Sequence, residues 1–228
     1  MPQAETSALA ADTAGLPAPV ALHEDADLLV LCKPSGLLCV PGRGPDKQDC
    51  LSARAQQHWP GALIVHRLDQ ATSGLVLMAR HAEAQRRLSL AFEQRQIHKR
   101  YVAVVQGLVA EPPGSWADIH LPIAADWERR PLRVIDAEHG KPSHTRWRPL
   151  DHNTAAGTTR VELEPVTGRT HQLRVHLAAL GHPILGDALY ADAATQAQAP
   201  RLLLHAGELA LAHPTTGQPM RWELVADF

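Results

Sequence analysis

One short stretch of the chain concentrates side chains that could do chemistry. Residues 64–80 begin and end with apolar runs, and between them lie the carboxylate of Asp69, the guanidinium of Arg67 and the hydroxyl of Thr72. The apolar runs predict two strands joined by a polar loop, and Gly74 can adopt backbone conformations that other residues avoid. A carboxylate held in this loop would be charged and orientable. An ordinary loop aspartate that accepts backbone hydrogen bonds is the alternative interpretation.

The sequence of this loop resembles the signature of an enzyme family. Residues 66–74 read His-Arg-Leu-Asp-Gln-Ala-Thr-Ser-Gly. This is similar to the motif of the RluA family of pseudouridine synthases, which has His-Arg-Leu-Asp, two variable residues and Thr-Ser-Gly. These enzymes break the bond between N1 and C1′ of a uridine in RNA, rotate the bound uracil and rejoin it through C5. The resemblance implies that Asp69 is the catalytic residue, either attacking C1′ or removing a ribose proton, and the sequence does not choose between these routes.

Two further stretches resemble the same family. Tyr101 follows a basic pair at the start of an apolar run, where the family has a tyrosine that lines the active site. Residues 168–176 read Gly-Arg-Thr-His-Gln-Leu-Arg-Val-His, and the family's corresponding motif supplies a basic residue that contacts the catalytic aspartate. We match this basic residue to Arg169, which would keep Asp69 ionised through a salt bridge. Tyr101 would support the base and help to remove the C5 proton.

Substrate contacts are expected from arginines near these motifs. The target base must leave its stack before it can react, and Arg67 and Arg43 are candidates to fill the gap or to hold the flipped strand, because a guanidinium both stacks and forms hydrogen bonds. Residues 126–133 place three arginines beside a tryptophan, as an RNA-binding surface does, although exposed ion pairs with nearby acidic residues would explain the same pattern. The full set of expected substrate contacts is Arg67, Arg43, His66, Thr72, Arg130 and Arg174.

The surrounding sequence predicts many short strands and few helices. The apolar run at 28–32, the run at 99–105 that begins with a basic pair, and the alternation of polar and apolar residues at 158–164 are typical of strands. Residues 81–94 have the spacing of an amphipathic helix. A helix is also predicted from about residue 171 to 180, with Thr170 as its cap. Together with the family resemblance, this pattern predicts an α+β fold in which helices flank a mixed, mainly antiparallel β-sheet and an RNA-binding cleft crosses its centre.

Composition limits the other classes of function. The chain has 228 residues, a formal net charge of −2 and three cysteines without Cys-x-x-Cys spacing, so no disulfide framework, zinc ribbon or metal site is expected. No cofactor motif is present, and the reaction implied by the resemblance needs none. We expect a disordered lead at residues 1–20 and one catalytic domain at residues 21–228, without a separate N-terminal RNA-binding domain. A cytoplasmic monomer with no membrane association is expected.

Two details concern the substrate and the rival functions. The turn at 40–43 and the stretch at 126–131 are similar to the short members of the family, which implies that 23S rRNA, a tRNA anticodon stem-loop or both are the substrates. One rival is a non-catalytic RNA-binding or chaperone module, but pure binding has no need of an acidic residue facing phosphate. Another rival is a hydrolase that uses Asp69 as its nucleophile, a class that usually shows a second carboxylate or a metal.

Overall fold

The computed structural model describes residues 18–110 and 112–228, so most of the lead expected at residues 1–20 lies outside the described residues. The first strand already begins at Val20, one residue inside the expected lead. The elements in chain order are β1 Val20–Glu24, β2 Leu28–Lys33, the 3₁₀ helix η1 Pro45–Lys47, α1 Leu51–His58, β3 Leu63–Ile64, β4 Ser73–Ala79, α2 Ala82–Glu93, β5 His98–Gln106, β6 Ala117–Ile119, β7 Ile123–Ala125, β8 Arg133–Ile135, β9 Thr145–Asn153, β10 Thr158–Pro165, α3 Gln172–Ala179, α4 Ala193–Ala197, β11 Leu204–Ala212 and β12 Pro219–Glu223.

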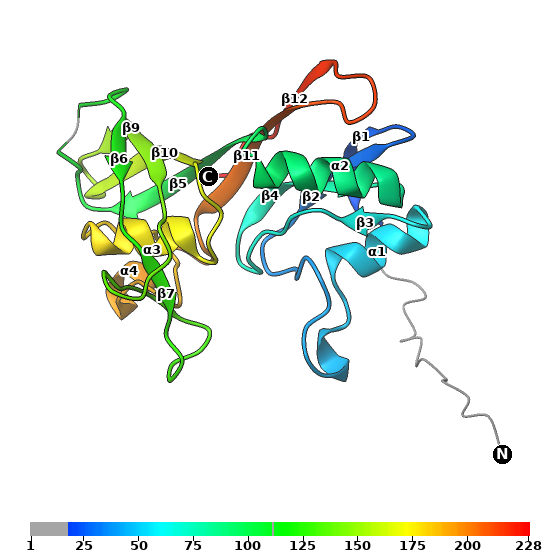
Figure 1. Ribbon diagram of the computed structural model, residues 1–228. Helices are drawn as coiled ribbons and strands as arrows, with labels where there is room; N and C mark the ends of the chain where they lie inside the picture. Colours follow the sequence, from blue (N-terminus) through cyan, green and yellow to red (C-terminus); the bar gives the residue numbers. More distant parts are fainter. Residues whose placement is uncertain (1–17, 111) are drawn as a thin grey trace.

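A ten-stranded sheet runs through both halves of the molecule. Its main order is β1-β2-β4-β11-β5-β10-β9-β6, with β3 added to β4 and β12 added to β11. Its pairs are antiparallel except for β4 with β11. Figure 1 shows α1 and α2 beside β2 and β4 in one half, and α3 and α4 beside β5, β9 and β10 in the other. The predicted α+β fold with a mainly antiparallel sheet is therefore confirmed.

The core lies on both faces of the central strands. Along β2, Leu29 and Leu31 belong to one buried cluster while Leu28 and Val30 belong to a second. A strand covered on both faces needs apolar residues at every position, which explains the continuous apolar run in the sequence. Among the described residues, no helix combines the length and the apolar character needed to cross a bilayer.

The parallel contact between β4 and β11 places the first motif at the centre of the sheet. Gly74 lies opposite Ala206 on β11, and Ala206 in turn lies opposite Tyr101 on β5. Gly74 has a φ of 118°, and a Cβ at this position would lie 2.3 Å from the carbonyl oxygen of Ala206. Only glycine allows this approach, which brings the loop of Asp69 next to the strand that carries Tyr101.

Candidate active site

Two adjoining cavities meet at Asp69. The first has a volume of about 860 Å³ and the second about 1040 Å³. Together we call them the cleft. Its first wall is the segment 66–74 and its second wall is the segment 167–190. The residues that line both cavities come from these two walls: Arg67, Leu68, Asp69, His171 and Arg174.

Main-chain contacts hold the first wall in place. The N–H of Thr72 donates to the carbonyl of Asp69 across 3.1 Å, which closes a tight turn around the carboxylate. Lys33, only 2% exposed, sends its ammonium group into the same region, and its three hydrogen bonds of 2.7–2.9 Å go to the carbonyls of Pro34, Leu37 and Gln70. Burial lowers the pKa of Lys33 to about 8, with nearby Cys39 and Asp69 opposing the shift. The sequence analysis assigned no role to Lys33.

The second wall provides the positive partner of Asp69. Nη1 of Arg174 lies 3.8 Å from Oδ2 of Asp69. The same guanidinium makes two hydrogen bonds, of 2.8 and 2.6 Å, with the carboxylate of Asp187, and the side chains of Arg174 and Asp187 are 5% and 1% exposed. Asp187 also accepts from the N–H groups of Leu189 and Tyr190, so its charge is fully hydrogen-bonded. This bidentate pair fixes where the positive charge stands beside Asp69.

The expected salt bridge between Arg169 and Asp69 is therefore wrong. Arg169 is exposed, and its guanidinium donates to the carbonyl of Pro142 across 3.2 and 3.3 Å. The motif contains two arginines five residues apart, and the helix begins between them, at Gln172. Arg174 thus lies in the first turn of α3 on its buried side, whereas Arg169 lies on the loop before the helix. Arg174, which was expected to contact the substrate, lines both cavities and also makes these two ion pairs.

His171 is the other group near Asp69. Its Nε2 lies 3.8 Å from Oδ1 of Asp69, and its Nδ1 lies 2.7 Å from the hydroxyl of Tyr190. Thr170 was expected to cap α3, but the N-cap is His171, whose φ of 57° and ψ of 15° are left-handed and whose side chain makes no capping bond. His171 faces the cleft instead. Neither His171 nor Tyr190 was recognised from the sequence.

Tyr101 lines the first cavity, as expected from the sequence. Its side chain is almost buried, with 9% of the residue exposed, because it belongs to the larger hydrophobic core cluster. Burial raises the pKa of Tyr101, and the negative charge of Asp69 raises it further. The phenol is therefore neutral at physiological pH, and it offers a ring face and an O–H donor; it would act as a base only after losing its proton.

The remaining predicted contacts are distributed unevenly around the cleft. Arg67 is exposed and lines both cavities, and Thr72 is buried and lines the first. His66 also lines the first cavity, but its Nε2 accepts the N–H of Leu77 at 2.9 Å, so this nitrogen is already used within the protein. Burial, helped by Lys99, lowers the pKa of His66 to about 3.

Arg43 and Arg130 lie on two projecting loops. Arg43 is exposed on the loop before η1 and lies outside the described lining of both cavities. Arg130 is exposed between β7 and β8 and stacks 3.8 Å from the ring centre of Trp127, which is itself 71% exposed. In Figure 1 the loop before η1 and the β7–β8 hairpin project in the same direction from opposite halves of the molecule.

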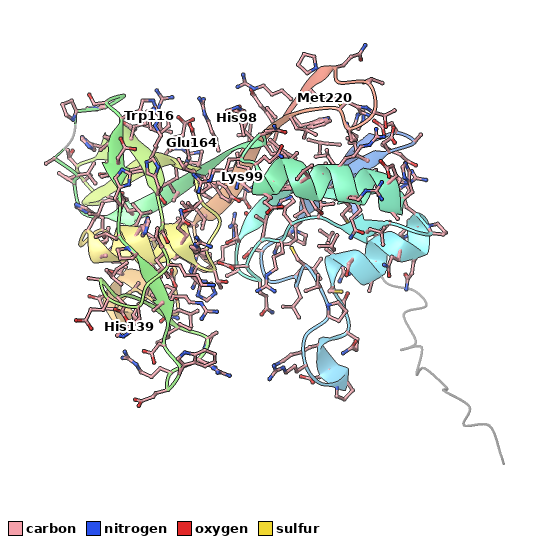
Figure 2. All side chains as sticks on the ribbon, in the orientation of Figure 1. His98, Lys99, Trp116, His139, Glu164 and Met220 are labelled. Atoms are coloured by element: carbon pink, nitrogen blue, oxygen red, sulfur yellow. The ribbon has the colours of Figure 1, made fainter. Side chains whose placement is uncertain are left out.

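The charge of the cleft differs from that of the whole chain. The first cavity is lined by five arginines or lysines, namely Arg67, Arg95, Lys99, Arg169 and Arg174, and by three acidic residues, namely Asp69, Glu93 and Glu164. Figure 2 shows His98, Lys99 and Glu164 where the two halves meet. Across the full sequence, acidic residues outnumber Lys and Arg by 24 to 22. The positive charge that phosphates require is thus gathered in the cleft of a nearly neutral protein.

Two groups of side chains in the described part of the chain have the composition of a metal site, and both lie outside the cleft lining. Asp118, His120 and His144 form one, and Asp25, Asp27 and His213 form the other. In the second group, Nδ1 of His213 accepts two backbone N–H groups, so the proton of a neutral ring lies on the Nε2 that faces the carboxylates. A protonated Nε2 is a donor toward the carboxylates and offers no lone pair to a metal ion.

Comparisons with known proteins agree with this geometry. The family model of RNA pseudouridylate synthases matches residues 27–179. The dual-specificity RNA pseudouridine synthase RluA of Yersinia pestis is 44% identical over 209 residues, which cover 92% of this chain and 100% of the relative. The protein of the same name from Escherichia coli is 46% identical, with 92% and 94% covered.

A solved structure leads to the same result. Human RNA pseudouridylate synthase domain containing 1 superimposes with a TM-score of 0.76 and 30% identity, over 92% of this chain and 84% of the human chain. The region that the family model matches includes the first wall of the cleft and the second wall as far as residue 179. It therefore contains the loop of Asp69, the strand of Tyr101 and the helix of Arg174. The chain therefore belongs to the family of RNA pseudouridylate synthases.

Proposed function

We propose that this protein isomerises uridines in more than one RNA, with Asp69 as the catalytic carboxylate. The observation that carries the proposal is the place of Asp69, at the junction of two cavities and within 3.8 Å of both Arg174 and His171. The names of the relatives specify dual-specificity RNA enzymes. On that basis we propose 23S rRNA and a tRNA anticodon stem-loop as the substrates.

The reaction needs one ionised carboxylate and no net loss of atoms. The N1–C1′ bond breaks, a C5–C1′ bond forms, the proton on C5 leaves and N1 gains a proton. Asp69 would either attack C1′ or take a proton from the ribose, and both routes require its charged form. The guanidinium of Arg174 favours that form through its positive charge, and the buried pair with Asp187 holds it in place. The reaction calls for neither a metal nor a cofactor.

The other cleft residues would bind the substrate. Neutral Tyr101 would stack against the flipped uracil, and exposed Arg67 would occupy the gap left in the RNA or hold the displaced strand. Arg43 and Arg130, on the projecting loops, would contact the RNA outside the cleft. Both walls of the cleft come from one chain, and one ten-stranded sheet includes strands from β1 to β12. We therefore propose a single catalytic domain that works as a monomer in the cytoplasm, where its RNA substrates lie.

The test compares the native protein with Asp69→Ala on unmodified transcripts of 23S rRNA and tRNA. Pseudouridine is mapped by carbodiimide labelling and primer extension. We expect stops at defined uridines on both RNAs with the native protein, and a rate at least about 10⁴-fold lower with Asp69→Ala. The matched control is Glu223→Ala, which removes an exposed carboxylate in β12, outside the lining of both cavities, and should leave the rate unchanged.

Four outcomes would contradict the proposal in whole or in part. Conversion by folded Asp69→Ala at a native rate would remove Asp69 from the mechanism. RNA binding without conversion by the native protein would favour a non-catalytic module, and release of free uracil would indicate a hydrolase. Stops on only one of the two RNAs would refute dual specificity and leave the catalytic assignment standing.

A further inference from the structure

The hydroxyl of Tyr190 is held between two groups of the second wall. It accepts the backbone N–H of Arg133 across 2.9 Å, and it lies 2.7 Å from Nδ1 of His171. The backbone N–H of Tyr190 donates to Asp187, which is the ion-pair partner of Arg174. The centre of the Tyr190 ring lies 5.1 Å from the guanidinium of Arg174. Tyr190 is thus connected to both basic groups that face Asp69.

These contacts determine where the protons stand. One lone pair of the Tyr190 oxygen is used by Arg133, and the hydroxyl proton needs an acceptor, which Nδ1 of His171 provides. Burial raises the pKa of Tyr190 and lowers the pKa of His171, so the phenol keeps its proton and the imidazole is neutral at physiological pH. If Nδ1 accepts, the single ring proton lies on Nε2.

The opposite side of the ring favours the same tautomer. Nε2 of His171 faces Oδ1 of Asp69 at 3.8 Å. A bare Nε2 would place a lone pair against a carboxylate, whereas Nε2–H presents a donor to it. The charged and titratable groups around the ring come from both walls and from β8: Asp69, Arg174, Arg133, Asp187 and Tyr190.

The backbone of His171 supports a role in the site. A left-handed conformation is unfavourable in a residue other than glycine and persists only where the surroundings enforce it. The side chain at an N-cap ordinarily accepts a backbone N–H of its helix, and that of His171 does not. With this backbone conformation, the ring of His171 contacts Tyr190 and faces Asp69.

From this arrangement we propose that Tyr190 fixes His171 as its Nε2–H tautomer, and that this N–H positions the carboxylate of Asp69 for reaction. His171 and Tyr190 are positioning residues, the first acting through Asp69 and the second through His171. The inference rests on the catalytic role of Asp69 proposed above. It adds two hydrogen bonds, one between the backbone of β8 and Tyr190 and one between Tyr190 and His171, and a contact of 3.8 Å that joins His171 to the carboxylate of Asp69.

The test combines two substitutions. Tyr190→Phe keeps the ring and removes the hydroxyl, and His171→Gln keeps an N–H donor at the place of Nε2 without a tautomer to fix. We expect Tyr190→Phe to lower kcat about tenfold with an unchanged KM for RNA, because one hydrogen bond of ordinary strength is lost. Adding Tyr190→Phe to His171→Gln should cause no further loss, because the glutamine has no tautomer to fix.

A second measurement needs no activity. Nitrogen-15 NMR of the free protein, with the His171 signals assigned by their loss in His171→Gln, shows which ring nitrogen carries the proton. Protonated Nε2 in the native protein and a mixture in Tyr190→Phe are expected. A proton on Nδ1, an unchanged kcat in Tyr190→Phe, or an equal loss in the His171→Gln background would overturn the inference. A native protein that converts no uridine would refute the proposed function and leave the tautomer result standing.

Discussion

The two walls of the cleft hold their functional groups by different means. On the first wall, backbone hydrogen bonds and the ammonium of Lys33 fix the loop, and the side chain of Asp69 remains 21% exposed. On the second wall, the charges themselves are buried, with Arg174 locked onto Asp187 inside the protein. On the first wall the reactive carboxylate is therefore separate from the groups that hold its loop, whereas on the second wall one guanidinium both faces Asp69 and satisfies Asp187.

The largest predicted effect follows from the removal of Arg174, which should lower both stability and rate. Arg174→Met keeps the length of the side chain and leaves the carboxylate of Asp187 buried without its cation, which should cost about 3–5 kcal/mol of unfolding free energy. The rate of pseudouridine formation should fall as well, because Asp69 loses its positive neighbour. Denaturant unfolding and the RNA assay measure the two effects.

Arg169→Met is the matched control for this prediction. Arg169 belongs to the same motif, but it is exposed and bonds a single carbonyl, so its loss should change the unfolding free energy by less than about 1 kcal/mol. If Arg169→Met were as damaging to stability and rate as Arg174→Met, the assignment of the two arginines would have to be reversed.

The same two arginines show where prediction from sequence ends. The first motif and the strand of Tyr101 are local patterns, and the sequence placed Asp69 in a loop and Tyr101 on a strand correctly. Which arginine of the second motif turns inward depends on the residue at which α3 begins, and a left-handed His171 is not encoded in any spacing. Asp187 and Tyr190 follow α3 by about ten residues and carry no recognisable motif, so only the folded chain brings them to Arg174 and His171.

Substitution of Lys33 tests how the first wall is held in place. Lys33→Met removes the donor to three carbonyls, and we expect a loss of about 2 kcal/mol in unfolding free energy together with a lower kcat, because the turn around Asp69 loses its support. Lys47→Met, an exposed lysine of η1, is the control and should be neutral. A stability equal to that of the native protein would show that the first wall does not depend on this ammonium group.

The smallest predicted effect is a dependence of stability on pH that comes from His66 on the first wall. His66 supports the first wall by accepting the N–H of Leu77, a bond that only the unprotonated Nε2 can make, and its pKa is lowered from 6.5 to about 3 by burial. Below pH 6.5 the unfolded chain takes up a proton that the folded chain refuses, so stability is complete above pH 6.5 and is lost as the pH falls toward 3.

Between pH 7 and pH 5 the contribution of His66 should fall by about 2 kcal/mol. His66→Gln keeps an acceptor for Leu77 and cannot titrate, so its unfolding free energy should fall by that much less than the native value over the same interval. Urea unfolding of both proteins at the two pH values measures the difference, and subtraction removes the contribution of other buried histidines such as His176 and His205, whose pKa values are also lowered by burial. Parallel pH profiles would mean that His66 accepts a proton in the folded protein, and that the first wall tolerates the loss of its bond to Leu77.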